Sequence, residues 1–387
     1  MKKIYATKTL QKDKLYNEIQ ESIKTYYKIS IEKEQKQKYY LKSLKVLNTT
    51  KNKLLDLDYD FERKYKEYSR ITQQRISTIE QMARDKEYVS LFITLTLPSC
   101  YHPFKSVSYK NERLYTKRND EFAFDSVNEA VKSGYQFLNE IYKTFYKRVK
   151  NFTKKELFYV KTIEAHTTLI PHLHCLLFFP LEHYDAIRGV YKRIIDHYQL
   201  QRVDMEEVLI KDNINCASRY ILKYIVKSLN DSSDYFEARV LDGWKRVNKI
   251  RLLSNSQIPL NLEIYKKIYY SISNIEKNRI FSKKNYKLFN VKEIIDEKVR
   301  TQGIPIYYFF QQNLFLEQKI FSADSNCSKT KQTKFGNIES LFHIKLDMER
   351  SRDSKNRLIY KIKKFIIKYR GIEIYQQQKY LILKNYI

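Results

Sequence analysis

The segment "YVSLFITLTLPS" at residues 88–99 constrains the fold more than any other part of this chain. Apolar residues alternate with a second set of residues along it, and Pro98 ends the run. The first set is Leu91, Ile93, Leu95 and Leu97, and the second is Ser90, Phe92, Thr94 and Thr96. Successive side chains of a β-strand point to opposite faces, so this period of two predicts a strand with one fully apolar face. Such a strand has to lie in a sheet that buries that face.

Predicted helices and strands alternate after this strand. A helix is expected at about Phe124 to Val149, strands at "ELFYVKTIEAH" (156–166) and "HLHCLLFF" (172–179), and a helix at Tyr184 to Tyr198. A short strand at "EEVLI" (206–210) and a helix at "CASRYILKYIVKSL" (216–229) follow. This order, with a hairpin in the middle, predicts an α+β fold with a central antiparallel-rich sheet backed by helices.

The regions on either side of this α+β domain are expected to be mainly helical. Residues 7–88 are polar and contain neither proline nor glycine, and the turn-like "NTTKNK" near Asn48 predicts a helical hairpin. We therefore expect a helical N-terminal region at 1–88, the α+β domain at 89–230 and a mostly helical C-terminal domain at 231–321. The polar stretch "SADSNCSKTKQTKFGN" (322–337) predicts a linker, so 322–387 is expected to be linker and basic tail.

The charge of the chain indicates a polyanionic partner. Lysine and arginine number 73 against 44 aspartates and glutamates, a formal net charge of +29 that is spread along the whole chain. Nucleic acid is the simplest such partner. The 34 tyrosines and 21 phenylalanines among the basic residues suit single strands, although an AT-rich genome would encode the same residues.

Other features of the composition exclude several classes of protein. The four cysteines lie far apart with no CxxC pair, which argues against a zinc ribbon and against a disulfide framework. No apolar run approaches the ~18 residues that span a bilayer, and the N-terminus lacks the apolar region of a signal peptide. We expect a soluble protein of a reducing cytoplasm, with no membrane partner.

Two histidines of "LIPHLHCLLFFP" (169–180) form the first candidate site. His172 and His174 project from the same face of the predicted strand, whereas Leu173 and Cys175 point into the core. Glu164 and His166 share one face of the preceding strand. A hairpin through "TTLIP" could therefore set Glu164 near His174 and His166 near His172.

This donor set suits a divalent metal ion. Two neutral imidazoles and a carboxylate oxygen fit Mn²⁺ or Mg²⁺ with open positions for phosphate oxygens, whereas a structural zinc site has four ligands. We take His172, His174 and Glu164 as the predicted ligands, with His166 as an outer partner or a substitute for Glu164. The alternative is that two histidines at a strand start are polar surface residues without a ligand.

Two tyrosines of the predicted helix at 216–229 form the second candidate site. Tyr220 and Tyr224 are four residues apart and share a helical face with Lys223 and Lys227, opposite an apolar stripe that includes Ile221. A tyrosine hydroxyl beside lysines and a bound metal can act as the nucleophile of a phosphoryl transfer. Lys223 is the predicted electrostatic partner in that reaction.

Three stretches in fixed order resemble the three motifs of the HUH endonucleases that initiate rolling-circle replication. These stretches are "FITLTLPSCYHP", "EAHTTLIPHLHCLLFF" and "SRYILKYIVKSL". Within that superfamily the chain is most similar to the two-tyrosine bacteriophage replication gene A protein family, and "RVLDGWKRVNKIRLLSNSQIPLNLEIYKKI" (239–268) resembles a segment that follows the nuclease there. In place of the Asp-Gly turn that the family tends to have before the histidines, this chain has "TTLIP".

The resemblance implies a fold, an activity and roles for residues. The sheet would be an HUH nuclease, or RRM-like, palm, with His172 and His174 as the metal-binding pair and Glu164 as third ligand. Tyr220 and Tyr224 match the two nucleophiles, and Lys223 and Lys227 match the lysines between them. One tyrosine would cut single-stranded origin DNA, keep the 5′ end as a phosphotyrosine ester and leave a 3′ hydroxyl that primes synthesis, and the second would resolve the displaced circle.

The exchange of one phosphodiester for another nearly conserves bond energy, so no ATP is needed. That agrees with the lack of a P-loop lysine motif in the chain and implies that a separate host helicase and the replication machinery are partners. Two rival hypotheses stay open. One is a relaxase or transposase of the same superfamily, and the other is a non-catalytic protein that only binds single-stranded DNA.

Overall fold

The computed structural model describes most of the chain. The described residues are 13–109, 113–154, 156–201, 205–210, 221–222, 235–281, 291–322, 325–335, 340–352, 356–378 and 380–384. The chain divides into two compact units, and each is described by itself below. Unit 1 is Met1–Leu41 with Asp58–Ser256, and unit 2 is Lys42–Leu57 with Gln257–Ile387.

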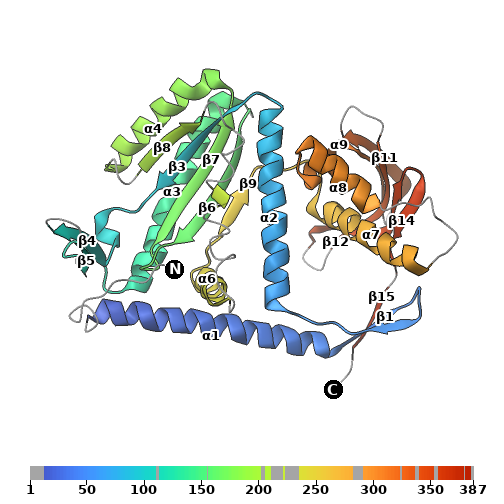
Figure 1. The fold of residues 1–387 in the computed structure, drawn as a ribbon, viewed down its shortest axis with the longest axis horizontal. Helices are drawn as coiled ribbons and strands as arrows, with labels where there is room; N and C mark the ends of the chain where they lie inside the picture. Colours follow the sequence, from blue (N-terminus) through green and yellow to red (C-terminus); the bar gives the residue numbers. More distant parts are fainter. Residues whose placement is uncertain are drawn as a thin grey trace. The chain divides into compact units, whose positions relative to one another are not determined.

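Unit 1 is built on a five-stranded sheet (Figure 1) with the strand order β8-β3-β7-β6-β9. The strands are β3 (Val89–Leu95), β6 (Phe158–Ala165), β7 (Pro171–Phe179), β8 (Met205–Ile210) and β9 (Leu253–Asn255). Every pairing in this sheet is antiparallel. The predicted α+β class with an antiparallel-rich sheet is therefore confirmed.

Two helices cover one face of this sheet. They are α3 (Val127–Thr153) and α4 (Tyr184–Tyr198), and they form a buried apolar cluster with Leu91 and Ile93 of β3 and Leu173 and Leu177 of β7. The Sγ of Cys175 donates to the hydroxyl of Tyr142 on α3 at 3.7 Å. The register predicted for β3 and β7 thus places their leucines and Cys175 in the core.

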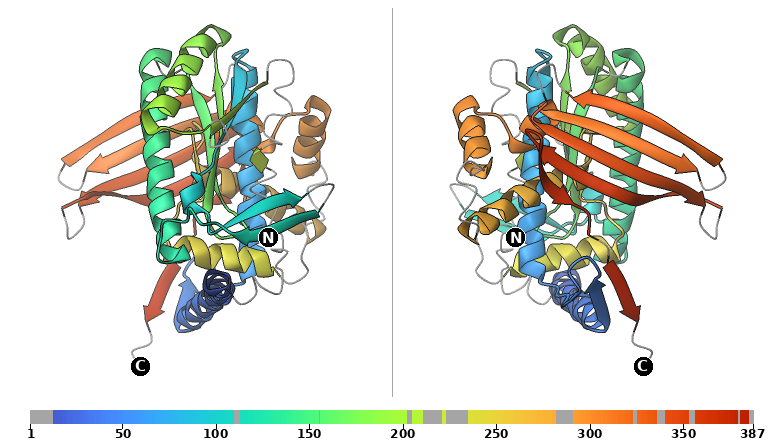
Figure 2. Two further views of the ribbon diagram at one scale, coloured as in Figure 1. Left: turned by 90° about the vertical axis from the view of Figure 1, so that its left-hand side faces the viewer. Right: turned by 90° about the vertical axis from the view of Figure 1, so that its right-hand side faces the viewer.

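The opposite face of the sheet carries the histidines and is also largely buried. Phe92, Val160, Leu176 and Phe178 lie on it and are at most 6% exposed. The helix α2 (Phe61–Arg84) contacts β6 and β7, and Figure 2 shows the strands between α3 on one side and α2 on the other. Because both faces of the central strands β3 and β7 are covered, these two strands carry apolar residues on both faces.

The described residues of unit 1 also form the helices α1 (Lys14–Lys42) and α6 (Phe236–Val247). Glu34 of α1 and Arg239 of α6 form an ion pair at 2.8 Å, with both side chains less than 15% exposed. Gly243 lets the two helices approach closely, because a Cβ at this position would overlap the backbone of Tyr26. A short helix η2 (Ser99–Tyr101) and the two-stranded ribbon of β4 (Phe104–Tyr109) and β5 (Arg113–Arg118) follow β3, and η3 (Leu181–His183) follows β7.

The described residues of unit 2 form two sheets and three helices. The helices are α7 (Leu262–Phe281), α8 (Val291–Gln302) and α9 (Ile306–Gln312). One sheet has the order β15-β1-β2, from β1 (Leu44–Asn48), β2 (Lys53–Leu55) and β15 (Tyr380–Lys384). The other has the order β11-β10-β12-β13-β14, from β10 (Leu314–Ser322), β11 (Ser325–Phe335), β12 (Phe342–Arg352), β13 (Leu358–Tyr369) and β14 (Ile372–Gln376). Strands β10 and β12 are parallel.

The structure differs from the expected organisation at both ends of the chain. The turn "NTTKNK" joins β1 and β2, so a strand pair interrupts the expected helical hairpin between α1 and α2. The expected linker at 322–337 contains β11, and the expected tail contains β12 to β15. Strand β11 is polar because it lies at the sheet edge, where backbone hydrogen bonds to β10 hold it. No helix in the described part of the chain is long and apolar enough to cross a membrane.

Candidate metal centre and nuclease site

The hairpin of β6 and β7 brings the predicted ligands together. Glu164 is the cross-strand partner of His172 in the register. Its side chain reaches diagonally to His174, with 3.2 Å between Glu164 Oε2 and His174 Nε2. The ring of His166 stacks on the ring of His172, with 4.9 Å between the centroids and 6° between the planes. The predicted neighbours, Glu164 with His174 and His166 with His172, are therefore the neighbours found.

Trp244, which is distant in the sequence, stabilises the turn between β6 and β7. Leu169 has a φ of 68°, a left-handed conformation that costs a residue other than glycine of the order of 1 kcal/mol or more. Leu169 and Ile170 are fully buried, and the indole nitrogen of Trp244 on α6 donates to the carbonyl of Leu169 at 3.1 Å. This burial and the indole hydrogen bond hold "TTLIP" in a turn that otherwise favours glycine.

His174 is buried and oriented on both sides of its ring. Its Nδ1 lies 3.2 Å from the Oγ1 of Thr94 on β3, and its ring stacks on Phe92 at 5.9 Å between centroids. The side chain is 4% exposed. An outer partner at one ring nitrogen fixes the tautomer and directs the other nitrogen toward a ligand. Thr94 therefore directs Nε2 of His174 toward Glu164.

His172 presents a buried ring nitrogen without a hydrogen bond. Its Nε2 is buried and has no hydrogen-bond partner. Burial above all, together with the nearby imidazoles of His166, His102 and His174, lowers the pKa of His172 from 6.5 to about 3. A buried polar atom without a partner costs roughly 1–3 kcal/mol, and a neutral imidazole with an unused lone pair is the form that binds a metal ion.

A fourth histidine, His102, joins the cluster and was not identified from the sequence. Its ring lies edge-on to the rings of His172 and His166, at 5.8 Å and 6.4 Å between centroids. Its Nε2 donates to the carbonyl of Leu97 at 3.0 Å. The pairing of β3 with β7 could have indicated this position. Leu95 lies opposite Leu173, so the residues that follow Leu95 run beside the first residues of β7, where His172 lies.

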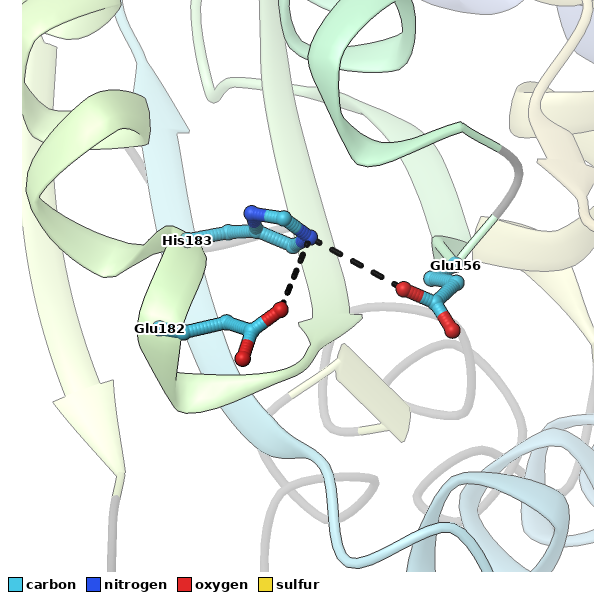
Figure 3. A group of neighbouring side chains, drawn as sticks. All are labelled: Glu156, Glu182 and His183. Atoms are coloured by element: carbon cyan, nitrogen blue, oxygen red, sulfur yellow. Dashed lines mark ion pairs between the residues drawn. The ribbon is translucent and has the colours of Figure 1, made fainter.

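The distances between donor atoms single out a different group of residues. Among the described residues, one group of three or more acidic, histidine or cysteine side chains has ligand atoms all within 4.8 Å of one another, namely Glu156, Glu182 and His183 (Figure 3). The glutamates are 56% and 75% exposed. In the hairpin, the Glu164 and His174 atoms are close enough to share an ion, since two cis ligands about 2.1 Å from an ion lie roughly 3 Å apart. The donor atoms of Glu164, His172 and His174 do not all lie within 4.8 Å of one another. The hairpin therefore fits a metal in its donor chemistry and in the spacing of Glu164 and His174.

The comparisons with known proteins identify the family. Residues 20–232 match the bacteriophage replication gene A protein (GPA) family, which is more than half of the chain. The chain belongs to this family. It is 25% identical over 167 residues to the replication gene A protein of Escherichia phage 186 and 26% identical over 162 residues to that of Escherichia phage P2. Each alignment covers 40% of this chain but only 22% and 20% of those proteins, so the chain spans about a fifth of the curated relatives it matches. No solved structure matches the chain.

The two predicted nucleophiles of this gene A family member, Tyr220 and Tyr224, lie outside the described residues. Tyr220, Lys223, Tyr224 and Lys227 fall in the segment 211–234, of which the structure describes only Ile221 and Leu222. Ile221 is helical and fully buried, in agreement with its predicted place on the apolar stripe. The roles of the two tyrosines and two lysines stay predictions.

Proposed function

We propose that this chain carries the origin-nicking activity of a phage-type replication initiator. In this proposal the protein is a metal-dependent endonuclease and strand transferase for single-stranded DNA. Membership of the gene A family supports a role in phage replication, and the hairpin geometry supports the choice of residues. The partners in this proposal are the single-stranded origin and a host helicase with its replication machinery.

One observation carries the proposal. On the buried β6–β7 hairpin, His174 and Glu164 hold donor atoms 3.2 Å apart beside the buried, unpartnered Nε2 of His172. Most buried polar groups form hydrogen bonds, so the unpartnered ring nitrogen of His172 beside a carboxylate supports its role as a metal ligand. His172, His174 and Glu164 would hold Mg²⁺ or Mn²⁺, which would polarise the phosphate that is to be cut.

The chain's own residues perform the transfer. The hydroxyl oxygen of Tyr220 or Tyr224 attacks the phosphorus, an O–P bond to tyrosine forms, and the bond to the 3′ oxygen breaks. The tyrosine proton leaves to solvent and the 3′ oxygen gains a proton, so the products are a 5′-phosphotyrosine and a 3′ hydroxyl. Lys223 and Lys227 stabilise the negative charge on phosphate and phenolate. The second tyrosine repeats the transfer in the later rejoining step.

The test is a covalent adduct. The full chain is incubated with Mn²⁺ and labelled single-stranded DNA from its own replicon, and the products are separated on a denaturing gel. We expect a labelled protein band that Tyr220→Phe and Tyr224→Phe each reduce and that the double change removes. Binding of the DNA without an adduct would favour the non-catalytic rival, and full activity of the double mutant would mean that other nucleophiles act.

A further inference from the structure

A pocket of about 200 Å³ lies in unit 1 on the histidine side of the sheet. One wall is a single face of α2, formed by Phe61, Lys64, Tyr65 and Tyr68 at helical spacing. A face of α6 forms the second wall, and Figure 1 shows α6 below the sheet beside the first turns of α2. Residues of β6 and β9 form the floor, so four separate elements of unit 1 line the pocket.

The lining combines flat aromatic rings with positive charge. Three tyrosines line it, namely Tyr59, Tyr65 and Tyr68, together with the cations of Lys64, Lys245 and Arg246. Lys245 and Arg246 both pair with Asp242 at 2.7 Å, and Lys64 pairs with Glu67 at 3.4 Å. These three cations and two carboxylates leave one surplus positive charge. Aromatic rings beside cations form the surface on which the bases of a single strand stack while its phosphates are neutralised.

The pocket adjoins the hairpin directly. Thr162 lines the floor of the pocket and is the cross-strand partner of His174. Directly opposed residues of an antiparallel pair have Cα atoms about 4.5–5.5 Å apart. A nucleotide with its base in this pocket would therefore be a close neighbour of a phosphate that lies at Glu164 and His174.

We propose that this pocket receives one base of the single-stranded DNA, next to the phosphate that is cut. The inference rests on the proposed nuclease function and adds a base-binding position to it. The volume is below the ~300–1,000 Å³ of pockets for drug-sized ligands, and it admits one flat base while the sugar and phosphates stay outside. The tyrosine rings stack on the base. The flanking phosphates face Lys64 together with Lys245 and Arg246.

Tyr68 gives the sharpest test, because it is 46% exposed and contributes little to the core. The variants are Tyr68→Ala, Tyr68→Phe, which keeps the ring, and Tyr39→Ala as a matched control, since Tyr39 is 77% exposed on α1 and lies outside the pocket. Binding of a fluorescein-labelled single-stranded oligonucleotide to the full chain is measured by anisotropy at two salt concentrations. Stacking of one base is worth ~1–3 kcal/mol, so we expect Tyr68→Ala to weaken binding about tenfold. Tyr68→Phe and Tyr39→Ala should stay within about twofold.

A photo-crosslink locates the base independently. An origin oligonucleotide carries 5-iodouracil at successive positions, and the crosslinked tryptic peptide is identified by mass spectrometry. We expect crosslinks to the α2 segment 61–68 from one or two positions beside the nick. Unchanged binding by Tyr68→Ala, or crosslinks that all lie elsewhere, would overturn the pocket while leaving adduct formation intact. Weakened binding by Tyr68→Ala without any adduct in the wild type would instead refute the nuclease and keep the pocket.

Discussion

The two ends of the β6–β7 strand pair carry groups of metal-ligating side chains that differ in kind. At the hairpin end, Glu164, His172 and His174 lie on a largely buried sheet face. At the opposite end, Glu156 precedes β6 and Glu182 and His183 follow β7 (Figure 3). The exposed group meets a simple distance criterion for three ligand atoms. The three hairpin donors do not meet it together, although the donor atoms of Glu164 and His174 lie 3.2 Å apart.

What separates the two ends is how their donors are held. His174 has an outer partner in Thr94, and the turn is fixed by Trp244. His183 lies 3.8–3.9 Å from two carboxylates that are more than half exposed, and exposed pairs of this kind contribute roughly 0–1 kcal/mol. Short distances between ligand atoms are thus a poor criterion for a metal site by themselves. Water hydrates surface carboxylates at little free-energy cost, whereas buried, oriented donor atoms need a bound partner.

The largest expected effect comes from replacing one histidine at each end of the strand pair, His174 at the hairpin end and His183 at the exposed end. We expect His174→Ala to lower Mn²⁺-dependent adduct formation more than about 100-fold, because it removes a predicted ligand and the contact of Glu164, and even outer partners of metal sites are worth about 10–100-fold. His183→Ala should stay within about twofold. The measurement is the initial rate of adduct formation on denaturing gels, with folding checked by circular dichroism. A large loss of adduct rate in His183→Ala would indicate that the metal binds at the exposed end.

The second test separates the two candidates for the third ligand within the hairpin. Glu164 Oε2 touches His174, whereas His166 stacks ring to ring on His172. We therefore expect Glu164→Gln to lower the adduct rate about 10–100-fold and to raise the Mn²⁺ concentration needed for half-maximal rate. His166→Gln should change both quantities by less than about fivefold. The reverse ranking would make His166 the ligand and Glu164 its outer partner.

The sequence was sufficient for those features that depend on local periodicity. The alternation in β3 placed Leu91 and Ile93 in the core, and the spacing of His172 and His174 placed both rings on one face. The hairpin brought Glu164 and His166 beside them because cross-strand neighbours follow from a short connection. These inferences needed only two adjacent strands.

Features that depend on long-range pairing could not be predicted in the same way. His102 reaches the cluster because β3 pairs with β7 across about eighty residues, and Trp244 reaches Leu169 across 75. In unit 2, β1 pairs with β15 from the other end of the chain, and β11 has too few apolar residues to show a strand pattern. The side-chain period of two does not specify such partners, because many registers satisfy it.

The smallest predicted effect concerns Trp244, whose indole holds the turn of the β6–β7 hairpin. Among the described residues, the exposed end with His183 has no equivalent of this contact. Trp244→Phe keeps an aromatic ring in the core but removes the hydrogen bond to the carbonyl of Leu169. A buried carbonyl left without its partner costs about 1–3 kcal/mol, so thermal unfolding followed by circular dichroism should occur several degrees lower. We also expect the adduct rate to fall a few-fold well below the unfolding temperature, because Leu169 and its neighbours join the strands that carry Glu164 and His172. Ile79→Val on α2, a fully buried change away from the turn, is the control for stability alone. If both variants lose stability and neither loses adduct rate, the indole bond stabilises unit 1 without positioning the hairpin, and the difference between the two ends reduces to burial.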